Sequence, residues 1–281
     1  MAAFEAQGDL VLSGQVADVK PLRRRLSWRR AAGTAMLVFS APAGLVALWW
    51  IASIYGWVSP QVLPRPDWVA QTFVDLVNGG DIVSAAAVSF RRIAEGFLIG
   101  ASSGFLFGLL IGRSTTAEAY LGPTFRALAA VPSIGWLPIL ILLLGIDEAL
   151  KIVILAKACF VPMAISTAEG ARNIPERLSD VADVLGLRAR TRFFKLVIPS
   201  MAPFIANGVR LSLSQAFVSL IVVEMLAGTD GLGYMMVWGR TLFQLDIVIV
   251  GMIVVGVVGF ALDLVLRRLE AVVRTGSASN G

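Results

Sequence analysis

Histidine is absent from this chain of 281 residues, and cysteine occurs once, as Cys159. These absences exclude disulfide scaffolds, zinc sites, haem ligation and histidine-based catalysis. Charged residues make up only 15% of the chain, whereas soluble domains contain about 25%. We therefore expect a membrane protein that has no metal site and no catalytic residue.

A P-loop is also missing. That motif needs a lysine followed by serine or threonine, which together hold the phosphates and magnesium of a nucleotide. The lysines here are followed by proline, isoleucine, alanine and leucine; they are Lys20, Lys151, Lys157 and Lys195. If the protein serves an ATP-driven process, the ATPase is a separate chain, and this chain binds no cofactor.

Apolar residues dominate what is present: they make up 57% of the chain, and the mean hydropathy is +0.79. A membrane-spanning helix needs about 20 predominantly apolar residues. Six segments meet that requirement, at roughly 32–57, 85–112, 120–144, 149–168, 199–226 and 247–266. The sequence therefore predicts an all-α polytopic membrane protein with about six transmembrane helices.

The net charge of +5 is explained by topology rather than by a nucleic-acid partner, because lysine and arginine gather on one side of the predicted spans. The opposite loops hold only Arg65, Lys151 and Arg240 among many acidic residues. The positive-inside rule then places both termini in the cytoplasm. Arg91, Arg92 and Glu95 fit this pattern less well, and they indicate either a cavity or an extra interfacial turn before the second span.

The predicted domain organisation has three parts. Residues 1–32 form a polar cytoplasmic tail and a basic stretch, PLRRRLSWRR, that suits a short interfacial helix or a simple positive-inside flank. Residues 33–270 form the transmembrane domain, with a long polar loop at about 171–199. Residues 271–281 form a second cytoplasmic tail.

Glycine recurs every fourth residue along the second predicted span, at Gly96, Gly100, Gly104, Gly108 and Gly112. Small residues at this spacing let helix backbones approach closely in lipid. We interpret the stripe as packing within the subunit rather than as a lining of a transport path.

The loop from Asp180 to Pro199 is the most unusual polar segment. Apolar residues just before Gly186 form one face of a short predicted helix, and Gly186 supplies the freedom for a turn. A basic stretch follows, and Pro199 suits the first turn of the next span. From the residues alone, the loop is either an ordinary positive-inside loop or a docking surface for a cytoplasmic partner.

This loop resembles the E-A-A-x-x-x-G-x(9)-I-x-L-P signature of binding-protein-dependent ABC importer permeases. Asp180, Val181 and Ala182 stand at the E-A-A positions, Gly186 matches the glycine, and Pro199 matches the proline. Leu196 and Ile198 stand at the isoleucine and leucine positions. The segments LPRPDWVAQTF, VPSIGWLPILILLLG and VVEMLAGTDGLGYMM are similar to the nitrate, sulfonate and taurine branch.

The resemblance implies a type I permease fold in the bacterial inner membrane. It implies a homodimer, two cytoplasmic ATPase subunits that bind ATP and magnesium, and an external or periplasmic substrate-binding protein. The substrate would be a small anion or zwitterion, such as an alkyl sulfonate, taurine or nitrate; pyrimidine precursors and bicarbonate are alternatives within the family. The implied ATPase contacts are Asp180, Ala182, Asp183, Gly186, Arg188 and Pro199.

Several residues in the spans are candidates for the translocation path or a gate. Prolines interrupt the third span and free backbone carbonyls, which suits either a cavity or a packing kink. Glu224 is an acid near the end of the fifth span, either functional or interfacial. The polar residues of the fifth span either line the path or bond between helices. The candidates are Pro132, Ser133, Trp136, Pro138, Gln215, Ser219 and Glu224.

Two other protein classes compete with this interpretation. A self-sufficient secondary transporter or channel would show paired intramembrane charges or an inverted repeat. The sequence shows no repeat, and it offers no evident intramembrane partner for Glu224. An intramembrane enzyme would need a nucleophile and a base, which a chain with no histidine and one isolated cysteine does not provide.

Overall fold

The structure, a computed structural model, describes residues 28–174 and 176–278, and every regular element in them is helical. The predicted all-α fold class is confirmed. The predicted tail at 1–20 lies outside the described residues, and so does most of the predicted interfacial helix at 21–30. The elements are α1 (Trp28–Ile54), α2 (Pro66–Asn78), α3 (Asp81–Arg113), α4 (Thr115–Ala130), η1 (Ser133–Trp136), α5 (Leu137–Leu144), α6 (Glu148–Arg172), α7 (Glu176–Val184), α8 (Ala189–Arg192), η2 (Phe193–Val197), α9 (Ile198–Ala227), α10 (Leu232–Thr241) and α11 (Leu245–Ala278).

The chain divides into two compact units, residues 1–51 and 52–281. Most of α1 belongs to the first unit, and its apolar part, Pro42–Ile54, is shorter than a usual span. The predicted first span corresponds to this helix. The second unit contains all the other elements.

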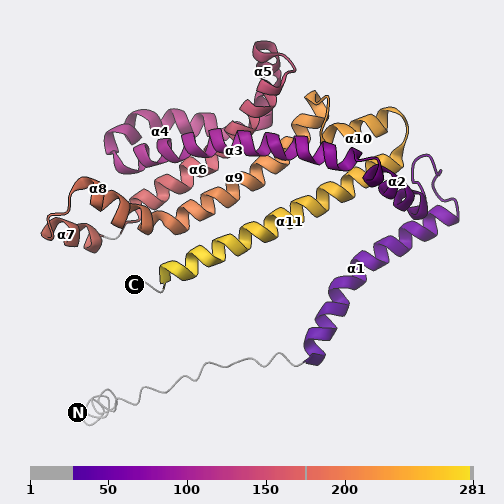
Figure 1. The fold of residues 1–281 in the computed structure, drawn as a ribbon, viewed down its shortest axis with the longest axis horizontal. Coiled ribbons are helices and arrows are strands. Elements are labelled where there is room, and N and C mark those ends of the chain that lie inside the picture. The colour runs from indigo at the N-terminus through magenta and orange to yellow at the C-terminus, as the bar shows by residue number, and fades with distance from the viewer. Residues whose placement is uncertain (1–27, 175, 279–281) are drawn as a thin grey trace, which may run out of the picture. The chain divides into compact units, whose positions relative to one another are not determined.

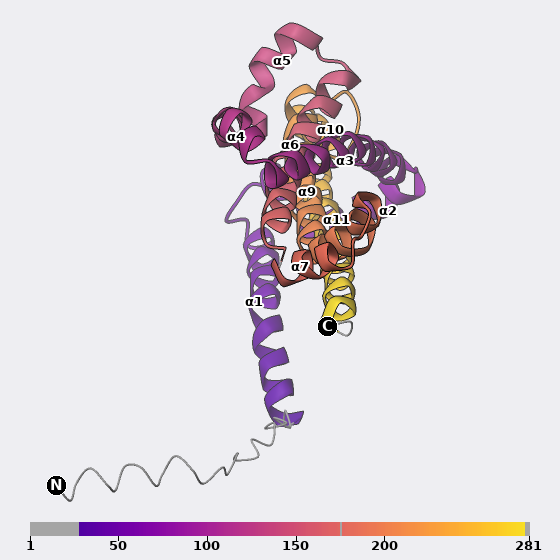
Figure 2. The ribbon, with the colours of Figure 1, turned by 90° about the vertical axis from the view of Figure 1, so that its left-hand side faces the viewer.

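The described part of the chain contains four helical segments long and apolar enough to cross a membrane, formed by α3, α6, the α8–α10 region and α11. The predicted third span is broken: α4 and the η1–α5 segment meet at 89° (Figures 1 and 2). Counted as one span, this pair raises the total to five. The helix α11 also continues to Ala278, well past the predicted end of the sixth span.

The centre of the second unit is the packing of α3 on α6. A Cβ added to Gly100 would lie 2.1 Å from the Ala156 carbonyl oxygen, and one added to Gly104 would lie 2.5 Å from the Phe160 carbonyl oxygen. Real Cβ atoms do not approach backbone atoms this closely, so only glycine permits the contact. The interpretation of the glycine stripe as packing within the subunit is confirmed.

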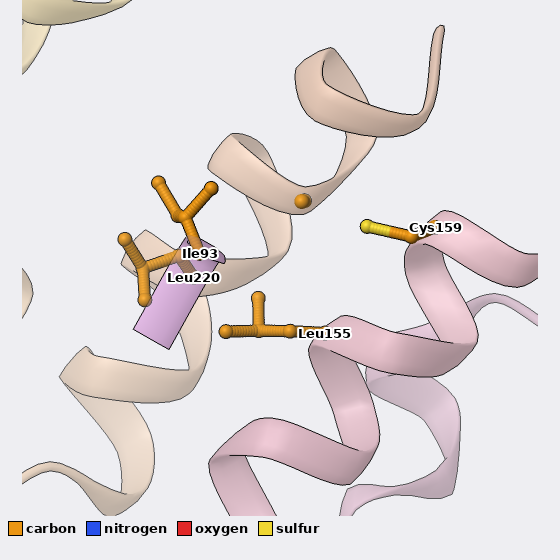
Figure 3. Close-up of a cluster of buried hydrophobic side chains, with 5 residues drawn as sticks. Ile93, Leu155, Cys159 and Leu220 are labelled. Atoms are coloured by element: carbon orange, nitrogen blue, oxygen red, sulfur yellow. The ribbon is translucent and has the colours of Figure 1, made fainter. Parts of the chain in front are cut away.

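Helix α9 packs against α6 and also contacts α3. Ile93 of α3, Leu155 and Cys159 of α6, and Ala216 and Leu220 of α9 form one buried apolar cluster (Figure 3). Cys159 is therefore a small buried core residue rather than an accessible thiol.

The two ends of the α6–α9 pair carry different structures (Figure 1). At one end, which we call the coupling end, α6 leads into α7 and α8 before α9 begins. At the other, which we call the α10 end, residues 228–231 connect α9 to α10. The sequence candidates lie at these two ends, along α9 and in the broken α4–α5 span.

Candidate coupling and translocation sites

The coupling end presents a short helix outside the spans. Helix α7 ends in a turn at Gly186, whose φ of 59° is a left-handed conformation that favours glycine. The Gly186 N–H donates to the Asp183 carbonyl at 3.1 Å, and the Leu187 N–H donates to the Ala182 carbonyl at 3.1 Å. This pair of bonds is a Schellman motif, which closes the helix end and fixes the direction in which the chain leaves it.

One ion pair holds the next segment against α7: Arg192 Nη1 lies 2.6 Å from Asp183 Oδ1. Ala182 is buried, whereas Val184 is 88% exposed and Leu185 is 66% exposed. A large apolar side chain so exposed beside a defined turn is suited to contact with a partner.

Three further motif positions have clear places in the structure. Asp180 and Arg188 are exposed on this segment. Pro199 occupies the first turn of α9, as the sequence predicted. Just before it, Phe193–Val197 form a π-helical turn, a widening that accommodates an extra residue in an otherwise continuous helix.

At the α10 end, a fully buried arginine lies among three carboxylates. Arg92 Nε donates to Glu148 at 2.9 Å, and Nη1 donates to Glu224 at 2.8 Å and to the Asp230 carbonyl at 2.9 Å. Its Nη2 pairs with the Asp230 carboxylate. Lys151, also buried, donates to Glu148 at 2.8 Å. Helices α3, α6 and α9 and the connection to α10 are thus joined by one network.

Glu224 is the fully buried acid of this network, with no exposed surface. Besides Arg92, it accepts a bond from Ser89 Oγ at 2.8 Å and one from the Gly233 N–H at 3.0 Å. Gly231 has a φ of 101°, and a Cβ there would lie 2.3 Å from Glu224 Oε1. The connection to α10 therefore wraps closely around this carboxylate.

This arrangement corrects two sequence expectations. Glu224 does have an intramembrane partner, Arg92, which lies 132 positions away along the chain. Arg91 and Arg92 are not in an extra interfacial turn, because α3 runs without interruption from Asp81. The sequence could not pair these charges, since only the packing of α3 on α9 brings them together.

At the broken span, the structure adds a residue that the sequence interpretation missed. Lys157 of α6 reaches the break, where its Nζ donates to the Val131 carbonyl at 2.8 Å and lies 5.5 Å from the centre of the Trp136 ring. The Trp136 indole N–H is buried and has no hydrogen-bond partner among the described residues. The sequence did contain a signal for this site, namely a lysine within an apolar run.

The other path candidates lie at the break and on α9. Pro132 and Pro138 are exposed at the break, and Ser133 is buried. On α9, Gln215 is exposed, and Ser219 is buried with its hydroxyl unpaired among the described residues. The described hydrogen bonds do not connect these two α9 residues to the break.

The chain matches a family model, the binding-protein-dependent transport system inner membrane component, over residues 104–275. The chain belongs to this family. Binding-protein-dependent permeases are non-catalytic, multi-pass inner-membrane components of ABC importers, and the family implies an ATPase and a binding protein as partners. The resemblance stated from the sequence is confirmed.

Relatives extend the likeness to nearly the whole chain. The permease SsuC of Bacillus subtilis (strain 168), named for aliphatic sulfonates transport, is 35% identical over 96% of both chains. The taurine transport system permease protein TauC of Escherichia coli (strain K12) is 29% identical over 88% of this chain and 92% of its own. The nitrate import permease protein NrtB of Synechocystis sp. is 31% identical over 66% of this chain and 67% of its own.

Among solved structures, inward-facing MetNI methionine ABC transporter matches with a TM-score of 0.50 and 19% identity, covering 69% of this chain and 94% of that chain. This likeness supports the permease fold. Family membership also decides against the self-sufficient secondary transporter or channel. The structure does contain paired intramembrane charges, the feature that we expected of that class. In this permease, those charges join helices at the α10 end.

Proposed function

We propose that two copies of this permease form the translocation path for a small anion or zwitterion, with an alkyl sulfonate as the first candidate and taurine or nitrate as the next. The observation that carries the proposal is the likeness to SsuC, which extends over 96% of both chains. An external binding protein delivers the solute, and two cytoplasmic ATPase subunits, which bind ATP and magnesium, drive the cycle.

The coupling end is the proposed ATPase dock. Its short helix, closed by the Gly186 turn and braced by the Asp183–Arg192 pair, is a rigid element with exposed apolar residues. A rigid helix set into a groove of the ATPase transmits motion to α6 and α9, which flank it in the chain. The proposed contacts are Asp180, Asp183, Gly186, Arg188 and Pro199, and Ala182, which is buried within this segment, supports them from inside.

The proposed orientation puts the coupling end and both termini in the cytoplasm, because the lysines and arginines of the loops gather there. The α10 end then faces outward and receives the binding protein. In this arrangement residues 1–32 and 271–281 flank a transmembrane domain at 33–270.

Two parts of the second unit are proposed to act in translocation. The broken span supplies Pro132, Ser133, Trp136 and Pro138, and α9 supplies Gln215 and Ser219. Glu224 acts differently: it is fully buried and accepts bonds from three groups, so it holds the outer connection in place as part of a gate. It does not bind an anionic solute.

The first experiment is purification of the tagged permease with its associated chains. We expect a P-loop ATPase to co-purify, and the Gly186→Trp variant to lose at least about nine-tenths of it, since a side chain at a positive φ strains the turn. Gly80→Trp is the matched control, because Gly80 also has a positive φ and open space around a Cβ. Equal ATPase recovery with both variants would contradict the dock.

The same complex, reconstituted with its binding protein, identifies the substrate class. We expect alkanesulfonates to stimulate ATP hydrolysis and to be taken up. Stimulation only by nitrate, bicarbonate or a pyrimidine precursor would support the importer function but contradict an alkanesulfonate as its substrate. No ATPase and no stimulation by any solute would overturn the proposed function.

A further inference from the structure

Lys157 lies deep within a membrane span. It is nine residues past Glu148 in α6, which is about 14 Å along a helix axis. The hydrocarbon core of a bilayer is roughly 30 Å thick, so this depth is close to the middle. A lysine at such a depth does not face lipid; it faces protein or a water-filled cavity and marks a solute pathway by default.

The protein satisfies this ammonium only in part. An ammonium has three N–H donors, and one of them goes to the Val131 carbonyl at 2.8 Å. The Trp136 ring adds a cation–π contact at 5.5 Å. Among the described residues, no carboxylate lies within ion-pair distance of Lys157, in contrast to Arg92 and Lys151, which are surrounded by acids. The ammonium therefore keeps N–H donors that the described residues do not use.

The surroundings of Lys157 are suited to an anion with an apolar tail. A cavity of about 240 Å³ lies beside the Lys157 side chain, and all of its lining surface is apolar. Trp136 belongs to the same lining, while its unpartnered indole N–H is itself buried. The lining residues are Phe125, Leu128, Ala129, Trp136, Lys157, Phe160 and Val161.

A second cavity continues this space along α4 and α6. It has a volume of about 310 Å³ and shares Phe125 and Ala129 with the first. Its lining includes Arg126 and Arg172, each 2.7 Å from Glu118. Because Arg172 is the last residue of α6, the second cavity reaches toward the coupling end.

We propose that Lys157 is the anion-binding residue of the translocation path. Its ammonium binds the oxyanion head of the solute, and the apolar cavity beside the Lys157 side chain receives the tail. The second cavity is the exit toward the coupling end. This inference rests on the proposed function and names the residue that recognises the anion, which the sequence alone did not declare.

The test compares maximal uptake of a short alkanesulfonate by the reconstituted complex at saturating loaded binding protein, so that binding-protein affinity does not limit the rate. We expect Lys157→Gln to lower uptake at least tenfold and Lys157→Arg to remain within about threefold of the native chain, because arginine keeps the charge. Arg267→Gln, which removes an exposed charge from α11, is the control and should be unchanged. Equal uptake by Lys157→Gln and the control would overturn the proposal.

A labelling experiment covers the case in which Lys157→Gln does not assemble. On a Cys159→Ala background, Lys157→Cys should react with a water-soluble methanethiosulfonate that carries a sulfonate, and a saturating alkanesulfonate should slow that reaction. No reaction would place the residue in lipid or sealed protein and overturn the site. A labelling rate that is the same with and without each anion would also overturn it. If the native complex transports no anion, the proposed function itself has failed.

Discussion

At the residue scale, the α10 end depends on the complete pairing of buried charges. Arg92 and Lys151 face Glu148, Glu224 and Asp230, and the described bonds connect all five. A buried charge is tolerable only when it is paired and hydrogen-bonded. Glu224 and Arg92 are both fully buried, so removing Glu224 would leave Arg92 without one of its partners in a low-dielectric interior. This pair therefore matters more than a surface charge does.

Glu224→Gln tests this pairing. The amide places N–H donors where Arg92, Ser89 and Gly233 already donate, so we expect a loss of stability on the order of 3–5 kcal/mol. Thermal unfolding of the purified permease in mild detergent measures it. Glu95→Gln is the control: Glu95 is exposed and 3.7 Å from Arg91, a pair worth at most about 1 kcal/mol. Equal midpoints for the two variants would contradict the network's role.

At the element scale, α3 and α6 form a rigid pair because their backbones touch. The contact continues to Gly108, where an added Cβ would lie 2.4 Å from the Ala164 carbonyl oxygen, and to Gly112, where it would lie 2.7 Å from Ala171 Cβ. Close backbone approach increases dispersion contacts along the whole interface. The pair therefore acts as a single body to which α9 is attached.

Gly100→Leu is expected to break this contact. The new side chain would enter the Ala156 backbone, and overpacking of this kind lowers the thermal midpoint by roughly 5 °C or more. Gly256→Leu is the matched control, because Gly256 also lies in a spanning helix but has nothing within 4 Å of an added Cβ. Membrane yield and thermal unfolding check both variants, and similar losses in both would contradict the assignment.

At the scale of the whole molecule, the proposed topology places the coupling end in the cytoplasm and the α10 end on the outer side of the membrane. On a Cys159→Ala background, Gln244→Cys between α10 and α11 should react with a membrane-impermeant maleimide on intact spheroplasts. Arg188→Cys should react only after permeabilisation. Both native residues are exposed. The opposite labelling pattern would reverse the orientation.

The sequence predicted the long spans, the Gly186 turn and the family motif, because each depends on residues close together in the chain. It predicted the broken span only as a pair of interrupting prolines, since the 89° angle depends on how η1 packs. It did not find the Arg92–Glu224 pair or the Lys157–Trp136 contact. Those contacts join different helices, and periodicity within one segment carries no information about them.

The buried arginine at the α10 end also sets an order for biosynthesis. Arg92 is translated 56 residues before Glu148 and 132 residues before Glu224. At about 5–20 residues per second, the ribosome needs roughly 7 to 26 seconds to reach the last of these partners. During that interval, releasing α3 alone into lipid would expose an unneutralised guanidinium. The nascent helix must therefore stay beside the insertion machinery until α6 emerges, so membrane integration of this permease is a delayed, collective event.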